Sequence, residues 1–125
     1  DLFVANYNQD NFLYQNNGDG SFTKITSGDI VNDGGSSNGA SFGDYNNDGY
    51  MDLFVANYNE DNFLYQNSGN SNNWVNITLN GTQIIGSRVS VLADINGQSI
   101  WQINELSSQT GYASQNSLNA EFNLS

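Results

Sequence analysis

The sequence contains no cysteine, no proline and no histidine, and it has very few cations. Without cysteine the chain forms neither disulfides nor thiolate metal sites. Without histidine it lacks the commonest general base and the commonest zinc ligand. Only Lys24 and Arg88 face 13 acidic residues, which gives a formal net charge of −11. A chain this acidic does not neutralise phosphates, so we expect no nucleic-acid partner and an attraction for cations.

Long apolar runs are also missing. No stretch approaches the roughly 18 apolar residues of a membrane span, so we expect no membrane insertion. The chain is nevertheless rich in aromatic residues, with seven Tyr, seven Phe and two Trp. This content is enough for a core and argues against disorder. Because the chain starts within an apolar run (residues 1–4), we expect a mature product or a piece of a longer protein.

An internal repeat dominates the first half. Residues 1–18 read DLFVANYNQDNFLYQNNG, and residues 52–69 read DLFVANYNEDNFLYQNSG. The two copies differ only at Gln9/Glu60 and Asn17/Ser68, with a 51-residue period. Such a period fits a four-stranded, blade-like unit better than a helical repeat. We therefore expect both copies to pack in equivalent surroundings.

The pattern within the repeat predicts short strands. Strands are expected at residues 2–5, 12–14, 22–26 and 40–43, with a hairpin turn at 16–20 and a polar loop at 27–39. Asn and Gly in the turn tolerate positive φ. This gives about four strands per unit, the count of a propeller blade.

The second half does not repeat. Val75, Ile77 and Leu79 alternate on one face of a predicted strand, and further strands are expected at 88–93, 99–103 and 118–124. A hairpin turn is predicted at Asn96-Gly97, an irregular segment at 107–117, and no helix anywhere. The sequence thus predicts an all-β chain: propeller-blade-type units over residues 1–69, then a small antiparallel β sandwich or barrel over 70–125.

An acidic loop at residues 44–52 follows the strand predicted at residues 40–43. Oxygen-bearing side chains occupy alternate positions at Asp44, Asn46, Asp48 and Asp52, and Gly49 allows a bend that turns the carbonyl of Tyr50 inward. Calcium prefers six to eight oxygen ligands, whereas magnesium resists dehydration. The spacing predicts a Ca2+ site formed by Asp44, Asn46, Asp48, Tyr50 and Asp52. The alternative is a plain Asn-Asn-Asp-Gly turn with solvated acids.

The first copy of the repeat has only part of this loop. Asp1 is equivalent to Asp52, and the other ligands would precede residue 1. The incomplete unit is expected to leave an unpaired strand edge, which invites pairing with another chain.

Two segments carry a family resemblance. Residues 11–22 (NFLYQNNGDGSF) and 42–57 (FGDYNNDGYMDLFVAN) resemble the FG-GAP/VCBS-type repeat. The second half resembles the ASPIC/UnbV domain in Trp74-Val75, Leu79-Asn80-Gly81, residues 86–89, residues 111–116 and residues 122–124. These resemblances imply propeller blades with calcium in the 44–52 loop, a secreted, extracellular or cell-surface location, and a binding or cell-adhesion role without catalysis.

Other candidate sites are weaker. Asn76, Asn80 and Asn123 head glycosylation-like sequons, and Asn76 and Asn80 fall on the polar face of their strand. Arg88 is expected to pair with Asp94 or Glu105. Trp74, Trp101 and Tyr112 could form a carbohydrate platform, although packing is the more usual role of large aromatics.

Three functions follow from these patterns. The favoured one is a calcium-stabilised extracellular binding or adhesion module whose partner is a protein or glycan at a cell surface. The alternative is a self-assembling structural subunit of an extracellular filament or surface layer, in which a neighbouring copy completes the N-terminal repeat. A glycosidase using Glu60, Glu105 and Glu121 is the least favoured, because Glu60 replaces Gln9 of the other copy and the sequence lacks His, Cys and a Ser-Lys pairing.

Overall fold

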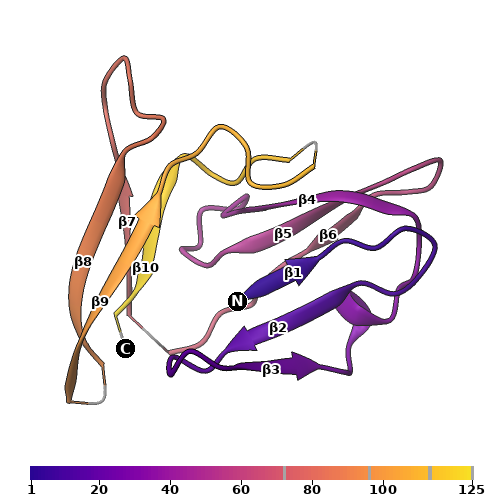
Figure 1. Ribbon diagram of the computed structural model, residues 1–125, viewed down its shortest axis with the longest axis horizontal. Coiled ribbons are helices and arrows are strands. Elements are labelled where there is room, and N and C mark those ends of the chain that lie inside the picture. The colour runs from indigo at the N-terminus through magenta and orange to yellow at the C-terminus, as the bar shows by residue number, and fades with distance from the viewer. Residues whose placement is uncertain (72, 96, 113, 125) are drawn as a thin grey trace.

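The computed structural model describes residues 1–71, 73–95, 97–112 and 114–124, and over these residues it is an all-β protein (Figure 1). The fold class predicted from the sequence is confirmed. Its ten strands are β1 (Leu2–Val4), β2 (Phe12–Asn16), β3 (Phe22–Ile25), β4 (Ser37–Gly43), β5 (Asp52–Asn57), β6 (Phe63–Tyr65), β7 (Trp74–Thr78), β8 (Arg88–Ile95), β9 (Gln98–Glu105) and β10 (Asn119–Asn123).

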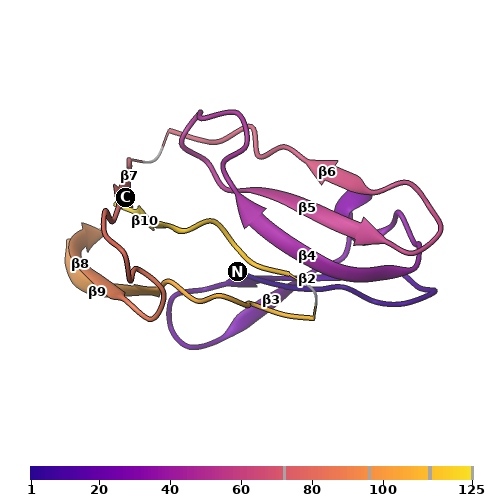
Figure 2. The same cartoon turned by 90° about the horizontal axis from the view of Figure 1, so that it is seen from above.

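The repeat region forms two three-stranded antiparallel sheets that lie one over the other (Figures 1 and 2). The sheet β1-β2-β3 comes first, and the sheet β4-β5-β6 follows. The complete period, residues 1–51, contains four strands, as predicted, but they are divided between the two sheets. β4 pairs with β5 of the next copy, from Gly43↔Asp52 to Ser37↔Asn57. Each sheet therefore holds three strands rather than four.

The two copies repeat their hydrogen bonds as well as their residues. The carboxylate of Asp1 accepts the backbone N–H of Asn16 at 2.9 Å, and that of Asp52 accepts the N–H of Asn67 at 2.7 Å. In the turn after each first strand, Asn8 and Asn59 adopt φ values of 59° and 56°. Near-identical sequence thus produces near-identical local hydrogen bonds. The expectation that both copies pack in equivalent surroundings is wrong, however: Leu2 is 49% exposed and its copy Leu53 is 3% exposed, because β1 is an edge strand whereas β5 lies between β4 and β6.

The polar loop predicted at 27–39 is shorter and more ordered than expected. A 3₁₀ turn spans Asp29–Val31, and β4 begins at Ser37 instead of Ala40. Val31 is buried and so gives this turn an apolar anchor. Ser37 joins the strand because it pairs with Asn57 of β5. Its N–H also donates to the carbonyl of Asn6, and its hydroxyl accepts from Asn11 at 3.0 Å, so the turn after β1 holds it in place.

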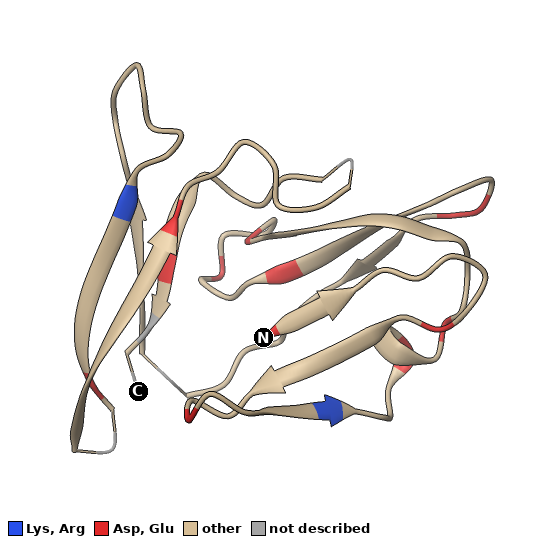
Figure 3. Ribbon diagram, in the orientation of Figure 1, with Lys and Arg blue, Asp and Glu red and all other residues tan. Residues whose placement is uncertain are grey.

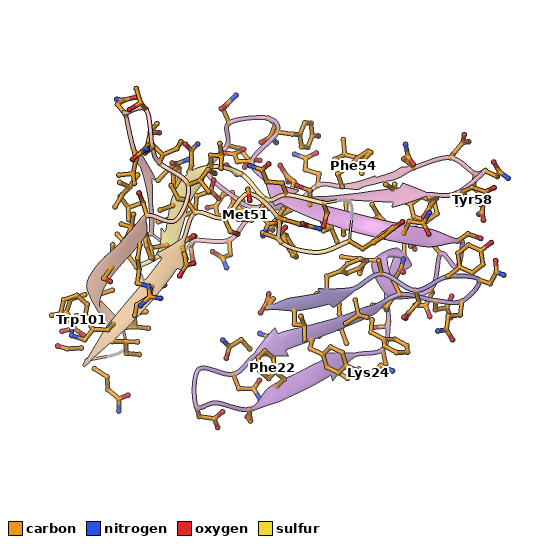
Figure 4. The ribbon with its side chains drawn as sticks, turned by 45° about the horizontal axis from the view of Figure 1, so that its top comes forward. Phe22, Lys24, Met51, Phe54, Tyr58 and Trp101 are labelled. Carbon is orange, nitrogen blue, oxygen red and sulfur yellow. The ribbon has the colours of Figure 1, made fainter. Side chains whose placement is uncertain are left out.

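The core of the repeat region lies on one face of the second sheet. Leu53 and Val55 are 3% and 0% exposed, whereas Phe54 between them is 43% exposed. Figure 4 shows Phe54 on the side of this sheet that faces away from β1-β2-β3. The alternation of side chains along a strand therefore gives this sheet one covered and one open face.

The second half consists of two antiparallel pairs, β7 with β10 and β8 with β9. Leu106, Ala120 and Phe122 form its buried cluster, and the partly buried side chains packed against them are Val75, Ile77, Leu79, Val89 and Val91. The predicted common face of Val75, Ile77 and Leu79 is confirmed. β8 and β9 pair out to Ile95↔Gln98, which confirms a hairpin, although Asn96 lies outside the described residues. No helix in the described part of the chain has the length and apolar character to cross a membrane.

The two halves are joined by hydrogen bonds far apart in sequence. The segment before β10 lies along β4, where the N–H of Ser117 donates to the carbonyl of Phe42 at 2.9 Å. The side chain of Asn116 in turn accepts the N–H of Phe42 at 3.0 Å. The hydroxyl of Ser41 also donates to the carbonyl of Gln115. The predicted irregular segment at 107–117 therefore ties the second half to the repeat region.

Candidate functional site

The candidate site is the acidic loop that connects β4 to β5. Asn47 and Gly49 take positive φ values of 59° and 92°, which wind the chain tightly between the two strands. Both oxygens of Asp44 accept backbone N–H groups, from Asp48 at 3.1 Å and from Gly49 at 2.8 Å. The loop thus folds around its first carboxylate.

Asp48 and Asp52 are held in the same manner. Asp48 accepts the N–H of Tyr50 at 2.9 Å and the side-chain amide of Asn46 at 2.7 Å. These two hydrogen bonds hold the pKa of Asp48 below its usual range, and the bond from Tyr50 makes the larger contribution. The carboxylate therefore stays charged. Asp52 is only 2% exposed, and its oxygens accept the N–H groups of Tyr45 at 3.2 Å and Asn67 at 2.7 Å.

The chemical types of the donor atoms in the loop suit a hard cation. Three carboxylates, one amide oxygen and the carbonyl of Tyr50 are the oxygen ligands that calcium prefers. Each carboxylate has about four acceptor positions, so the backbone N–H bonds leave room for a cation. The carboxylates do not converge, however: across the described ranges no group of three or more acidic side chains lies close enough to hold a metal ion. Binding would require them to turn toward a common point.

Aromatic rings pack against the outer side of the loop. The indole of Trp74 from β7 lies on Gly49, and a Cβ at Gly49 would be 1.8 Å from the indole Cζ2. The ring of Tyr50 lies on Gly69 in the same way, and its hydroxyl donates to the carbonyl of Asn70. The packing of Trp74 on Gly49 is not predicted from the sequence, since no local pattern links residue 74 to residue 49.

A cavity of about 480 Å³ lies beside this loop, where the two repeat sheets and the second half meet. Polar amides and acids line most of it, together with the rings of Tyr50 and Trp74. Its lining residues are Asp1, Gln15, Asn16, Gly49, Tyr50, Met51, Asn67, Asn70, Asn73, Trp74, Glu121 and Phe122.

Glu121 brings an acid from β10 toward the loop. Burial raises the pKa of Glu121, and the charges of Asp44 and Asp52 raise it further. Its Oε1 is 3.5 Å from the amide nitrogen of Asn76, while Oε2 is buried without a hydrogen-bond partner. The nearness of Glu121 to the acidic loop comes from the docking of the second half, which the sequence pattern does not encode locally.

The remaining predicted residues are spread over the molecule. Asn80 is exposed, but Asn76 is half-buried rather than exposed because β10 pairs with its strand and places Glu121 opposite it. The side chain of Asn123 and residue Ser125 of its sequon lie outside the described residues. Of the three sequons, the one at Asn80 is therefore the most accessible in the described part of the chain.

The two cations lie on different sheets (Figure 3). Arg88 pairs with Glu105 at 3.0 Å, as predicted, with both side chains more than half exposed. Lys24 lies over the ring of Phe12 at 3.9 Å from its centroid, a cation–π contact that the sequence does not predict.

The three large aromatics do not form one platform. Trp74 lies against the loop, whereas Trp101 is 65% exposed on β9 and Tyr112 is 79% exposed in the segment before β10. Figure 4 shows Trp101 at the far edge of the second half.

The geometry defines an all-β repeat protein built from blade-like antiparallel sheets, with an oxygen-rich loop between the paired strands β4 and β5 of the second sheet. Comparison with known families agrees, because the model of the FG-GAP-like repeat matches residues 1–55 and again residues 44–98. The chain belongs to the FG-GAP-like repeat family. The second match runs past the sequence repeat, which ends near residue 69, and includes β7 and β8.

One curated relative is Cartilage acidic protein 1 of Xenopus tropicalis. It is 39% identical over 66 residues, which cover 52% of this chain and 10% of the relative. The chain thus spans about a tenth of that protein's length. A search of the solved structures found no significant match.

Proposed function

We propose that this chain is a calcium-stabilised extracellular binding module that acts without catalysis. The observation that carries the proposal is the 44–52 loop, in which oxygen donors at alternate positions surround one tight turn. A net charge of −11 adds a field that attracts cations. We also propose that residues 70–125 form an ASPIC/UnbV-like domain.

In this proposal Asp44, Asn46, Asp48, the carbonyl of Tyr50 and Asp52 hold the ion. Calcium supplies positive charge among carboxylates that otherwise repel one another. The chain's own contribution is to fix the loop: backbone N–H groups orient Asp44, and burial holds Asp52 at the start of β5. An ion there would stabilise the junction of β4 and β5, and with it Trp74 of the second half.

The extracellular location and the binding role rest on family membership and on the relative whose name places it in cartilage. The exposed aromatic side chains of the chain offer contact area to a surface protein or glycan, since aromatics are enriched where proteins bind. The part of the chain that the structure describes includes Tyr45, Tyr58 and Trp101 among its exposed rings.

Calorimetric titration with calcium chloride tests the ion site. We expect binding by the wild type, loss of binding in Asp48→Asn, and unchanged binding in Asp61→Asn, which removes an exposed acid outside the loop. Calcium at about 100 times its Kd should add about 2.7 kcal/mol to the free energy of unfolding. Equal titration curves for Asp48→Asn and Asp61→Asn would refute the site. The binding role is then tested on arrays of glycans and cell-surface proteins in calcium and in chelator.

A second candidate function is a self-assembling structural subunit. The specific observation in its favour is that both repeat sheets carry large apolar side chains on their outer faces, with Leu2 49% and Leu64 52% exposed. Apolar patches that stay exposed on a folded domain mark association sites. Sedimentation of the wild type over a range of concentrations tests this candidate.

A further inference from the structure

Asparagine followed by glycine recurs along the chain, and such a pair can modify itself. The backbone nitrogen of the glycine attacks the side-chain carbonyl carbon of the asparagine, and glycine favours this because it has no Cβ to crowd the new ring. Whether the attack occurs depends on how firmly the structure holds each pair. The pairs are Asn17-Gly18, Asn38-Gly39, Asn80-Gly81 and Asn96-Gly97, of which the last includes a residue outside the described part of the chain.

The pair Asn17-Gly18 is held by hydrogen bonds on both reacting groups. The side-chain nitrogen of Asn17 donates to the hydroxyl of Ser21 at 2.8 Å, and its side-chain oxygen accepts from the hydroxyl of Thr23 at 3.0 Å. The N–H of Gly18 donates to the side-chain oxygen of Asn16 at 2.9 Å. Ring closure at Asn17 would therefore have to break these bonds first.

The pair Asn38-Gly39 is held by a strand. Both residues belong to β4, where Gly39 is buried and pairs with Ala56 of β5. The side chain of Asn38 is exposed, but the pairing fixes the backbone that would have to turn toward it. Ring closure at Asn38 would therefore require local opening of β4 from β5.

The pair Asn80-Gly81 is held by neither device. It lies in the loop between β7 and β8, which projects beyond the ends of these strands (Figure 1), and both residues are exposed. Among the residues that the structure describes, neither the side chain of Asn80 nor the N–H of Gly81 makes a hydrogen bond. A Cβ built at Gly81 would meet no atom within 4 Å, so the peptide group has room to rotate.

We propose that Asn80 is a site of intramolecular deamidation, with water as the co-reactant. The nitrogen of Gly81 forms a bond to Cγ of Asn80, the Cγ–Nδ2 bond breaks, and the proton of the Gly81 nitrogen leaves with Nδ2 as ammonia. Water then opens the succinimide ring. Cleavage of the bond from the nitrogen to Cγ gives aspartate, and cleavage of the bond from the nitrogen to the backbone carbonyl carbon of residue 80 gives isoaspartate.

The reaction changes the loop in two ways. A neutral amide becomes a carboxylate, which adds one negative charge, and isoaspartate also lengthens the main chain by one methylene group. The Asn80-Gly81-Thr82 sequon is lost as well, because a glycan attaches to the amide nitrogen that leaves as ammonia. Glycosylation and deamidation of Asn80 therefore exclude each other. This proposal depends neither on the calcium site nor on the binding role.

Peptide mapping by tandem mass spectrometry tests the proposal. The folded protein is incubated for several days in mildly alkaline buffer, with a parallel sample in urea, and digested with trypsin after Lys24 and Arg88. Asn17 then lies in one peptide, residues 1–24, and Asn38 and Asn80 lie in the next, residues 25–88.

In the folded protein Asn80 should deamidate about tenfold faster than Asn17 and Asn38, or more. A tenfold difference in rate corresponds to about 1.4 kcal/mol on the barrier, roughly what one hydrogen bond contributes. In urea the three residues should react at similar rates, because the restraints on Asn17 and Asn38 are gone. If Asn80 reacts no faster than the other two in the folded protein, the site is refuted.

Two variants test the ring-closing step. Gly81→Ala should slow deamidation of Asn80 about tenfold, because the added methyl group crowds the attacking nitrogen, and the open space around Gly81 leaves the fold intact. The matched control Thr82→Ala removes the sequon but keeps Asn80-Gly81 and should react at the wild-type rate. Deamidation of Gly81→Ala at the wild-type rate would show direct hydrolysis of the amide and overturn the intramolecular route.

Discussion

The indole of Trp74 lies directly on the α-carbon side of Gly49, so closely that a methyl group at residue 49 would be 1.8 Å from Cζ2 and 1.9 Å from Cε2 of the ring. Trp74 begins β7, and Gly49 closes the acidic loop between β4 and β5. A residue of the second half thus covers the turn on which the candidate ion site depends. This contact joins the second half to the repeat region.

Substituting Gly49→Ala should destabilise the protein by about 3 kcal/mol or more. The added methyl group overlaps an aromatic ring, and overpacking of this kind costs about 1–3 kcal/mol. The φ of 92° adds the penalty of a left-handed conformation, about 1 kcal/mol. Urea unfolding followed by tryptophan fluorescence measures the loss.

Gly20→Ala is the matched control for the penalty of placing alanine at a positive φ. Gly20 has a φ of 88°, yet no atom lies within 4 Å of the position that the added methyl group would occupy. It should therefore lose only about 1 kcal/mol. Equal losses for the two alanine variants would show that the Trp74 contact contributes nothing.

The repeat offers a second matched pair in Asp52→Asn and Asp1→Asn. Asp52 is 2% exposed and accepts two backbone N–H groups, whereas Asp1 is exposed and accepts the N–H of Asn16. Hydrogen bonds to a buried charged group contribute about 1.5–3 kcal/mol, so Asp52→Asn should lose that amount and Asp1→Asn less than about 1 kcal/mol. Thermal unfolding in chelator gives the comparison without any contribution from calcium. A loss in Asp1→Asn as large as that in Asp52→Asn would contradict the assignment.

Glu121 should make the protein less stable as pH rises. Its pKa is raised in the folded state above the ordinary value of 4.5 by burial and by Asp44 and Asp52. Between the unfolded and the folded pKa the native state binds more protons than the unfolded state, so the free energy of unfolding falls as pH increases through this window. Glu121→Gln removes the titration and should be more stable than the wild type at pH 7 in chelator.

The control for this prediction is Glu60→Gln, which changes an exposed glutamate in the turn after β5. Unfolding is measured from pH 4 to pH 8 for the three proteins. The difference between wild type and Glu121→Gln should widen with pH by more than the difference between wild type and Glu60→Gln. If the free energies of unfolding of wild type and Glu121→Gln differ by the same amount at every pH, the pKa of Glu121 is not raised in the folded state.

Local patterns in the sequence are sufficient to predict most of the fold. Alternating apolar residues predict β7 and its buried face. The near-identical copies form equivalent strands with equivalent hydrogen bonds, but the predicted equivalence of their surroundings is wrong, because β1 is an edge strand and β5 is a central one. The predicted start of β4 is three residues too late, because Ser37-Asn38-Gly39 has the composition of a loop. Ser37 belongs to the strand because it pairs with Asn57 of β5, and Asn6 and Asn11, which lie far away in sequence, also bind it.

The surroundings of the candidate site are not predictable in the same way. The spacing of Asp44, Asn46, Asp48 and Asp52 identifies the loop, and the predicted pairing of Arg88 with Glu105 is confirmed. The positions of Trp74 and Glu121 beside that loop depend on how the second half docks, through Asn116 and Ser117 on β4. Contacts between segments this far apart leave no repeating pattern in the sequence. Neither Trp74 nor Glu121 can therefore be assigned to the site from the sequence alone.

Leu106→Ala should show how far the second half depends on its small core. Leu106 is 1% exposed and packs with Ala120 and Phe122, and its N–H donates to Ser87 at 2.9 Å. Truncating a buried leucine leaves a cavity and costs about 2–5 kcal/mol. The matched control Leu92→Ala removes the same atoms from a side chain that is 52% exposed and should cost less than about 1 kcal/mol. Because β10 continues from the segment bound to β4, hydrogen exchange in Leu106→Ala should speed up at Phe42 as well as in β7 and β10. Faster exchange confined to β7 and β10 would instead show that the repeat region holds its structure without the second half.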